Sequence, residues 1–185
     1  MTELHWRLFV GVPLSPAAGA ALWRGLAELR ALHSGARWMA PEQYHATLVF
    51  LGRTEVARAG NVMATVQRAA AGWRRVRAAP GGVGGRVGGR RGGVAWLRIG
   101  AGRRELADYS LALDDALGSQ TYAAGPPRPH VTLARKVDGV LLSDMRLRLE
   151  RLKAEWLFER VVVYRSLTGP AGSRYEELAS FGLAA

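Results

Sequence analysis

The sequence contains no cysteine. Disulfide bonds, thiolate nucleophiles and zinc sites with sulfur ligands are therefore excluded, and a reducing cytoplasm is the simplest location. A chain of 185 residues can bury most of its apolar surface without such cross-links. We expect residues 1–185 to fold as a single domain.

Long apolar runs are also missing, and none is long enough to cross a bilayer. The N-terminus lacks the basic start, the apolar stretch and the small-residue cleavage site of a signal peptide. We therefore expect no membrane association. We also expect a monomer with no obligate protein partner.

Acidic residues are scarce relative to basic ones. Lys and Arg together number 26 against 15 for Asp and Glu, a formal charge of +11, and nearly all of the basic residues are arginines. Arg presents a planar fork of donors that fits phosphate oxygens, so this charge indicates a polyanionic partner. A GC-rich genome would also favour Arg over Lys, but it does not explain the excess of positive charge.

Apolar periodicity and Gly/Pro punctuation predict the order of the elements. Strands are expected at 7–12, 45–51, 73–78, 94–99, 130–135, 158–165 and 175–181, and helices between 15 and 35 and at 55–71, 103–117 and 143–156. In each half, a strand, a helix and a proline precede a His-x-Thr-Leu tetrad. The chain therefore looks like an internal duplication, which predicts two similar lobes facing each other across a cleft.

The segment 80–93 reads PGGVGGRVGGRRGG. It has little side-chain volume to pack and great backbone freedom, so we expect a flexible Gly/Arg-rich loop. It lacks the Lys-Ser/Thr ending of a P-loop and matches no dinucleotide-binding pattern. Its arginines, Arg86, Arg90 and Arg91, either reach over a bound polyanion or remain solvated.

The tetrads HATL, from His45, and HVTL, from His130, are the strongest chemical signal, separated by 130 − 45 = 85 residues. Their chance occurrence has a probability on the order of one in ten thousand. Because side chains alternate along a strand, each His shares a face with the Thr two residues later, Thr47 or Thr132. One tetrad alone would be read as an ordinary core strand, but the repeated pair indicates a site.

Two imidazoles can supply both a neutral base and a charged acid near neutral pH. Opening a cyclic phosphodiester needs both, and Thr47 and Thr132 can donate hydrogen bonds to the non-bridging oxygens. Carboxylates are sparse around both tetrads and no HExxH is present, so we expect no metal.

Other residues near the tetrads have more than one interpretation. Arg135 is either a phosphate clamp or a solvated charge, and strict alternation would turn it away from His130 unless a bulge re-aims it. Tyr44, Phe50 and Tyr122 could stack a base, although buried packing is the favoured role for Phe50. His5 and His33 lack a Thr partner and are interpreted as structural or surface residues.

Four segments resemble one known family, the two-histidine (2H) phosphoesterases, and within it the bacterial and archaeal RNA 2′,3′-cyclic phosphodiesterases, long labelled 2′-5′ RNA ligases. They are RLFVGVPLS from Arg7, RWMAPEQYHATLVFLG from Arg37, RPHVTLAR from Arg128 and VYRSLTGPAGSRYEELASFGL from Val163. The resemblance implies an α+β fold with two pseudo-symmetric lobes, antiparallel sheets with outer helices around a central cleft.

The resemblance also implies an activity on RNA ends. A 2′,3′-cyclic phosphate would be opened to a 2′-phosphomonoester without a cofactor, with reversible 2′-5′ RNA ligation as a side activity. His45 would be the proton donor and His130 the proton acceptor, with Thr47, Thr132 and Arg135 around the phosphate. Two alternatives remain: a phosphodiesterase for small cyclic nucleotides, and a non-catalytic RNA-binding module. Family members usually carry a more apolar segment where this chain has the glycines of 80–93.

Overall fold

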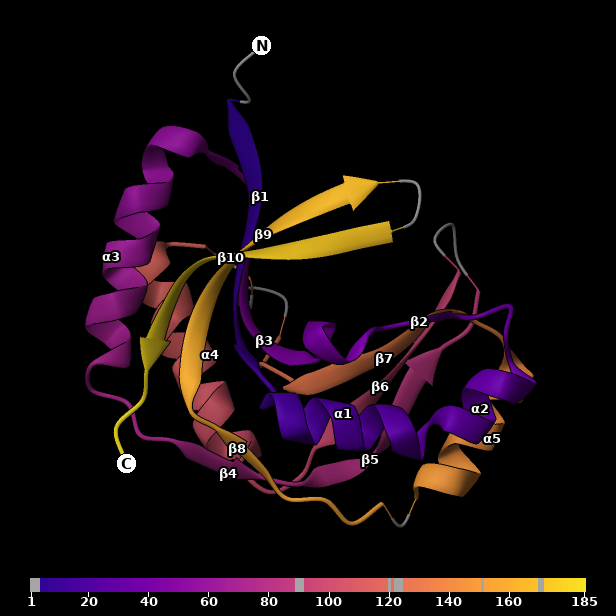
Figure 1. Cartoon of the computed structure of the whole chain (residues 1–185). Coiled ribbons are helices and arrows are strands. Elements are labelled where there is room, and N and C mark those ends of the chain that lie inside the picture. Colours follow the sequence, from indigo (N-terminus) through magenta and orange to yellow (C-terminus); the bar gives the residue numbers. More distant parts are fainter. Residues whose placement is uncertain (1–3, 89–91, 120, 122–124, 151, 170–171) are drawn as a thin grey trace.

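The computed structural model describes residues 4–88, 92–119, 121, 125–150, 152–169 and 172–185 (Figure 1). Its strands are β1 (His5–Pro13), β2 (Arg37–Trp38), β3 (His45–Glu55), β4 (Val76–Ala78), β5 (Pro80–Arg86), β6 (Gly93–Ile99), β7 (His130–Val137), β8 (Trp156–Phe158), β9 (Arg160–Gly169) and β10 (Gly172–Gly182). Its α-helices are α1 (Pro16–Gly25), α2 (Ala27–Leu32), α3 (Ala59–Ala70), α4 (Arg103–Leu117) and α5 (Gly139–Leu149).

One antiparallel sheet runs through the molecule in the order β10-β9-β1-β3-β7-β6-β5. Strand β2 pairs with the C-terminal half of β7. A second, two-stranded sheet joins β4 to β8. Helices α3 and α4 lie beside the β10-β9-β1-β3 half, whereas α5 packs on β5 in the other half (Figure 1). The fold is therefore α+β, with antiparallel sheets and outer helices, as the sequence predicts.

The first predicted helix begins where expected. Ser15 is its N-cap and accepts a hydrogen bond from the backbone N–H of Ala18 at 3.2 Å, while Pro16 occupies the first turn. The chain then breaks at Leu26, so that the expected single helix is two, α1 and α2. Leu26 is fully buried, which fixes the corner between them.

The helix predicted at 143–156 is displaced. Asp138 caps α5 by accepting a hydrogen bond from the N–H of Leu141 at 2.8 Å, so the helix begins at Gly139 and ends at Leu149. Trp156 belongs instead to β8, where its side chain is buried. The apolar pattern is compatible with a helix at either position. The Asp138 cap determines the earlier start.

The loop prediction for 80–93 is wrong over its first half. Residues Pro80–Arg86 form strand β5, which pairs with β6 in register Gly84 to Trp96 and Arg86 to Val94. Residues 89–91, with Arg90 and Arg91, lie outside the described residues. The glycine-rich composition therefore makes an edge strand here.

The glycines of β5 have a packing reason. A Cβ at Gly84 would lie 2.3 Å from Nε1 of Trp96, so the indole lies directly on the backbone of β5. On the opposite face, a Cβ at Gly85 would lie 2.5 Å from Cδ1 of Leu142, a residue of α5. Only glycine lets both neighbours approach this closely.

The core joins both halves of the sheet. Val10, Ala46, Val131 and Val163 are all fully buried and belong to one cluster. They come from four strands, so the strands that hold the two tetrads are anchored in common packing. Within the described ranges, no helix is long and apolar enough to cross a membrane.

Candidate active site

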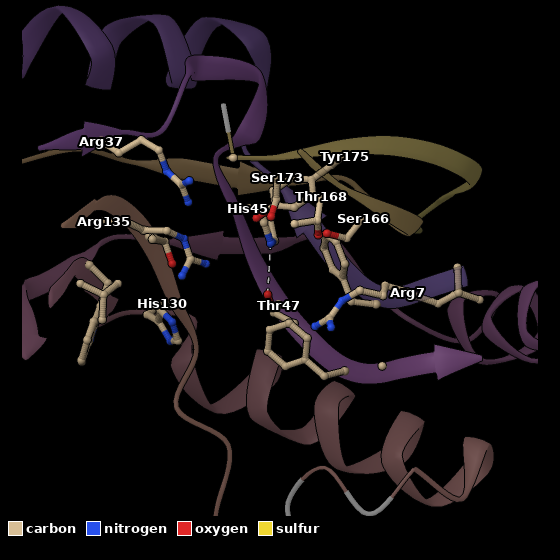
Figure 2. A pocket seen from close by; sticks show the side chains of 18 of the residues that line it. Arg7, Arg37, His45, Thr47, His130, Arg135, Ser166, Thr168, Ser173 and Tyr175 are labelled. Carbon is tan, nitrogen blue, oxygen red and sulfur yellow. Dashed lines mark hydrogen bonds between the residues drawn. The ribbon is translucent and has the colours of Figure 1, made fainter. Parts of the chain in front are cut away.

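A pocket of about 710 Å³ opens between the two halves of the sheet (Figure 2). It brings together all five residues that the sequence analysis selected: His45, Thr47, His130, Thr132 and Arg135. As far as the chain is described, its lining contains no Asp or Glu. The pocket is therefore cationic, and it suits an anion.

Both histidines are held in the same way. Nδ1 of His45 lies 2.7 Å from the carbonyl oxygen of Gln43, and Nδ1 of His130 lies 2.8 Å from the carbonyl oxygen of Arg128. Since a carbonyl only accepts, each Nδ1 carries the hydrogen and donates it. Each Nε2 is therefore the nitrogen left to accept or deliver a proton.

The two rings have different surroundings. The ring of His45 is packed among aromatic rings, with centroid distances of 5.0 Å to Phe9, 5.3 Å to Tyr175 and 5.7 Å to Tyr164. The ring of His130 is tilted against Trp96 at 5.4 Å. His45 is more closely surrounded by aromatic rings than His130 is. It still lines the pocket, so a ligand can reach it.

Burial lowers the pKa of His45 to about 4, because the aromatic surroundings disfavour the charged imidazolium. The hydrogen bond to the Gln43 carbonyl opposes this shift, whereas the positive charges of His130 and Arg135 add to it. At this pKa His45 is neutral near pH 7. Its Nε2 lies 3.1 Å from Oγ1 of Thr47.

A bulge re-aims Arg135 as the sequence analysis requires. The register between β6 and β7 shifts from the pair Ala95–Ala134 to the pair Trp96–Thr132, skipping Leu133. Leu133 and Ala134 are both buried, so the alternation resets and Arg135 lines the pocket with His130.

The same shift occurs in β3, where the register with β1 skips Leu48. Phe50 therefore occupies the position, five residues after its His, that Arg135 occupies in the second repeat. Phe50 lines the pocket and is 60% exposed, so its favoured interpretation as a buried packing residue is wrong. One repeat presents an aromatic ring and the other a guanidinium.

The other candidate aromatic residues differ from Phe50. Tyr44 is 1% exposed, and burial raises the pKa of its hydroxyl, so it is a core residue and cannot stack a base. Tyr122 lies outside the described residues. His33 bonds to Asp144 at 2.8 Å and His5 to Arg53 at 3.3 Å, which agrees with their interpretation as structural or surface residues.

The pocket also contains residues that the sequence analysis missed. Arg37 lies opposite Arg135 in the β2–β7 pair, and Figure 2 shows both on one side of His45, with Arg7 on the other. Trp96 adds an aromatic wall beside His130. Arg37 and Arg7 begin two of the segments that resemble the family, but no motif distinguishes them from other surface arginines.

Strands β9 and β10 supply a polar wall. Ser166, Thr168 and Ser173 line the pocket from this hairpin (Figure 2). The side chain of Gln43 donates a hydrogen bond to the carbonyl of Ser173 at 2.8 Å, which ties the hairpin to the segment that orients His45. Gln43 thus connects the wall of the pocket to the first histidine.

The fold and the paired tetrads together define the class of two-histidine phosphoesterases. The family model of the 2′-5′ RNA ligase superfamily matches residues 18–170, and the chain belongs to that superfamily. No curated protein matches the sequence significantly.

Solved structures agree with this assignment. The chain is 27% identical to TT0787 of Thermus thermophilus, with 96% of this chain and 97% of that one covered and a TM-score of 0.75. It is 19% identical to E. coli LigT in complex with ATP, with coverage of 99% and 100% and a TM-score of 0.70. The complex of E. coli LigT with 3′-AMP gives 20%, coverage of 98% and 99%, and a TM-score of 0.71.

Proposed function

We propose that this protein hydrolyses RNA ends that carry a 2′,3′-cyclic phosphate, releasing a 2′-phosphomonoester. The observation that supports this most strongly is the matched orientation of the two histidines. Each donates through Nδ1 to the carbonyl two residues earlier and leaves Nε2 for the substrate, in a pocket whose described lining has four arginines and no carboxylate.

In the proposed step, Nε2 of His130 accepts a proton from water as the water oxygen attacks phosphorus. The bond from phosphorus to O3′ breaks, and His45 delivers a proton to O3′, so the phosphate remains on O2′. Thr47, Thr132 and Arg135 hold the non-bridging oxygens while negative charge builds on them. The direction of proton transfer rests on the family resemblance, because the hydrogen bonds of Nδ1 are alike for both histidines.

The donor role requires a charged His45, and a pKa of about 4 opposes this. An anionic phosphate beside the ring favours the charged form and raises that pKa. Proton uptake by His45 is therefore coupled to substrate binding.

The same step accounts for ligation at a 2′-5′ junction. If the 5′-hydroxyl of a second RNA replaces water, the new phosphodiester forms while the phosphate remains on O2′. The product is a 2′-5′ linkage, and by microscopic reversibility the enzyme can cleave it again. E. coli LigT has been solved with phosphate, ATP, 3′-AMP and NADP⁺, which is consistent with a nucleotide pocket in this fold.

The test is hydrolysis of a short RNA with a 2′,3′-cyclic phosphate end, in EDTA, by the native chain and by the variants His45→Ala and His130→Ala. Loss of one acid or base is expected to lower kcat by about 10²- to 10⁴-fold. His5→Ala is the matched control and should retain native turnover. The product should be the 2′-phosphate.

Two results would redirect the proposal. Turnover of small cyclic nucleotides but not of RNA would indicate a phosphodiesterase for small substrates. Binding of RNA without any turnover would indicate the non-catalytic module. Location in a reducing cytoplasm belongs to the same proposal and is supported by the lack of cysteine. A monomeric state is proposed with it.

A further inference from the structure

We infer that the outer face of the β5–β6 hairpin is a platform for the single-stranded RNA that precedes the reacting end. We call it the β5–β6 platform and define it by Arg86, Trp96 and Arg98. The inference rests on the proposed function, and it addresses whether the substrate is a chain or a mononucleotide.

The platform is continuous with the catalytic strand. In the β6–β7 pairing, Trp96 lies opposite Thr132 and Arg98 lies opposite His130. Residues two apart on a strand share a face, so Arg98 extends the face of Trp96 by about 7 Å. A chain whose last phosphate sits at His130 can therefore continue over β6 without leaving the sheet.

Gly84 of β5 makes room for the platform. The indole of Trp96 lies on Gly84, where a Cβ would meet Nε1 at 2.3 Å. The guanidinium of Arg98 lies over Gly82, where a Cβ would stand 3.7 Å from Nη1. Gly84 thus lets the large side chain of Trp96 lie on β5, and the guanidinium of Arg98 lies on the same strand beyond the pocket.

The charge of this face fits a polyanion. Strands β5, β6 and β7 contain no acidic residue, and both Arg86 and Arg98 are exposed. Neither has an ion pair among the residues that the structure describes. Arg86 also lines the pocket, so positive charge continues from the pocket to the rim.

An aromatic ring between cations is the usual surface for unpaired nucleotides. Bases stack on aromatic side chains while basic groups follow the phosphates, and stacking does not depend on the identity of the base. Trp96 is half-buried against His130, so the base that precedes the reacting nucleotide can stack on it. The platform therefore predicts preference for a chain over a mononucleotide, with little sequence specificity.

The test is equilibrium binding, which needs no turnover. The ligands are a fluorescein-labelled RNA tetranucleotide ending in a 2′-phosphate and the corresponding nucleoside 2′-phosphate as competitor. The native chain should bind the tetranucleotide about tenfold more tightly than the mononucleotide at low salt. Arg98→Ala should reduce this ratio severalfold and lower the slope of log K against log salt by about 0.7.

The matched control is Arg104→Ala on α4, whose side chain is 93% exposed. It removes the same charge elsewhere and should keep the native ratio. A second readout places 2-aminopurine at the penultimate position of the RNA. Stacking on Trp96 should quench the fluorescence of this base. Trp96→Ala should abolish that quenching, while Arg104→Ala should not.

Equal affinity of the native chain for the tetranucleotide and the mononucleotide would overturn the platform. So would an equal loss of affinity in Arg98→Ala and Arg104→Ala. The outcomes also separate the two proposals. Hydrolysis of cyclic ends without an effect of chain length removes the platform only, whereas tight binding of the tetranucleotide through Arg98 without hydrolysis removes the proposed activity only.

Discussion

Ala46 of β3 and Val131 of β7 lie opposite each other and join the two halves of the sheet. Each is the residue directly after a histidine that we propose to be catalytic. In an antiparallel pair, the residue before one partner lies next to the residue after the other, so His45 is placed on the side of Thr132 and Thr47 on the side of His130. The two repeats therefore meet at this pair in a locally twofold arrangement, in which each histidine lies on the side of the other repeat's threonine.

The roles of the two histidines can be separated with a leaving group that needs no proton. In an RNA end whose 3′ bridging oxygen is replaced by sulfur, the thiolate leaves unprotonated, so the acid becomes dispensable. We expect His45→Ala to regain most of its activity on this substrate and His130→Ala to remain inactive. Rescue of His130→Ala instead would reverse the assignment of donor and acceptor.

Stability should depend on pH through His45. The pKa of this group is about 4 in the folded chain against 6.5 for an ordinary histidine, so between these values the unfolded chain holds more protons. The free energy of unfolding is therefore unaffected by His45 above pH 6.5. It decreases as the pH falls toward 4, by at most about 3 kcal/mol. Urea unfolding of the native chain and of His45→Gln at pH 7 and pH 4.5 measures this contribution, and the variant should lose less stability than the native chain.

Arg135 should affect both substrate binding and the acid. Arg135→Ala is expected to lower kcat/KM by about 10²- to 10³-fold, because one donor to the phosphate is lost. Its positive charge also contributes to the low pKa of His45, so the variant should raise that pKa, which NMR titration of the ring can follow. An unchanged titration would show that Arg135 lies too far from His45 to act on it. Arg104→Ala is the control.

The glycine at position 84 should be intolerant of any side chain. Gly84→Ala forces the Trp96 indole from its place and is expected to reduce the free energy of unfolding by about 1–3 kcal/mol. Gly60→Ala in α3 is the matched control, since a Cβ there meets nothing within 4 Å, and it should be neutral or slightly stabilising. Equal effects of the two changes in thermal unfolding would contradict the packing described for β5.

Much of the site was predictable because it depends on local periodicity. The alternation of His45 with Thr47, and of His130 with Thr132, places each pair on one face whatever the rest of the fold does. The need for a bulge before Arg135 also followed from alternation, and the structure has the bulge. The resemblance to a family supplied the antiparallel arrangement that local pattern alone could not.

The rest depends on neighbours that are distant in the sequence. Strand β5 was predicted as a loop because glycine has no strand preference of its own, and its pairing is decided by Trp96 above it and Leu142 below it. Phe50 was expected to be buried and Tyr44 to be available to a base, whereas the structure exposes Phe50 and buries Tyr44. The reason is similar. A bulge at Leu48 turns Phe50 into the pocket, and no feature of the sequence marks it.

Strand β5 forms one edge of the large sheet, so the glycine-rich stretch is also a cover for β6. Deletion of 80–93 as a dispensable linker would remove the strand that pairs with this side of β6. The backbone N–H and C=O groups along that side of β6 would then be unpaired. An open, apolar edge of this kind pairs readily with another chain, and the expected result of the trimming is aggregation. Removing these residues, which have the least side-chain volume, would therefore lead to aggregation although both histidines remain in the chain.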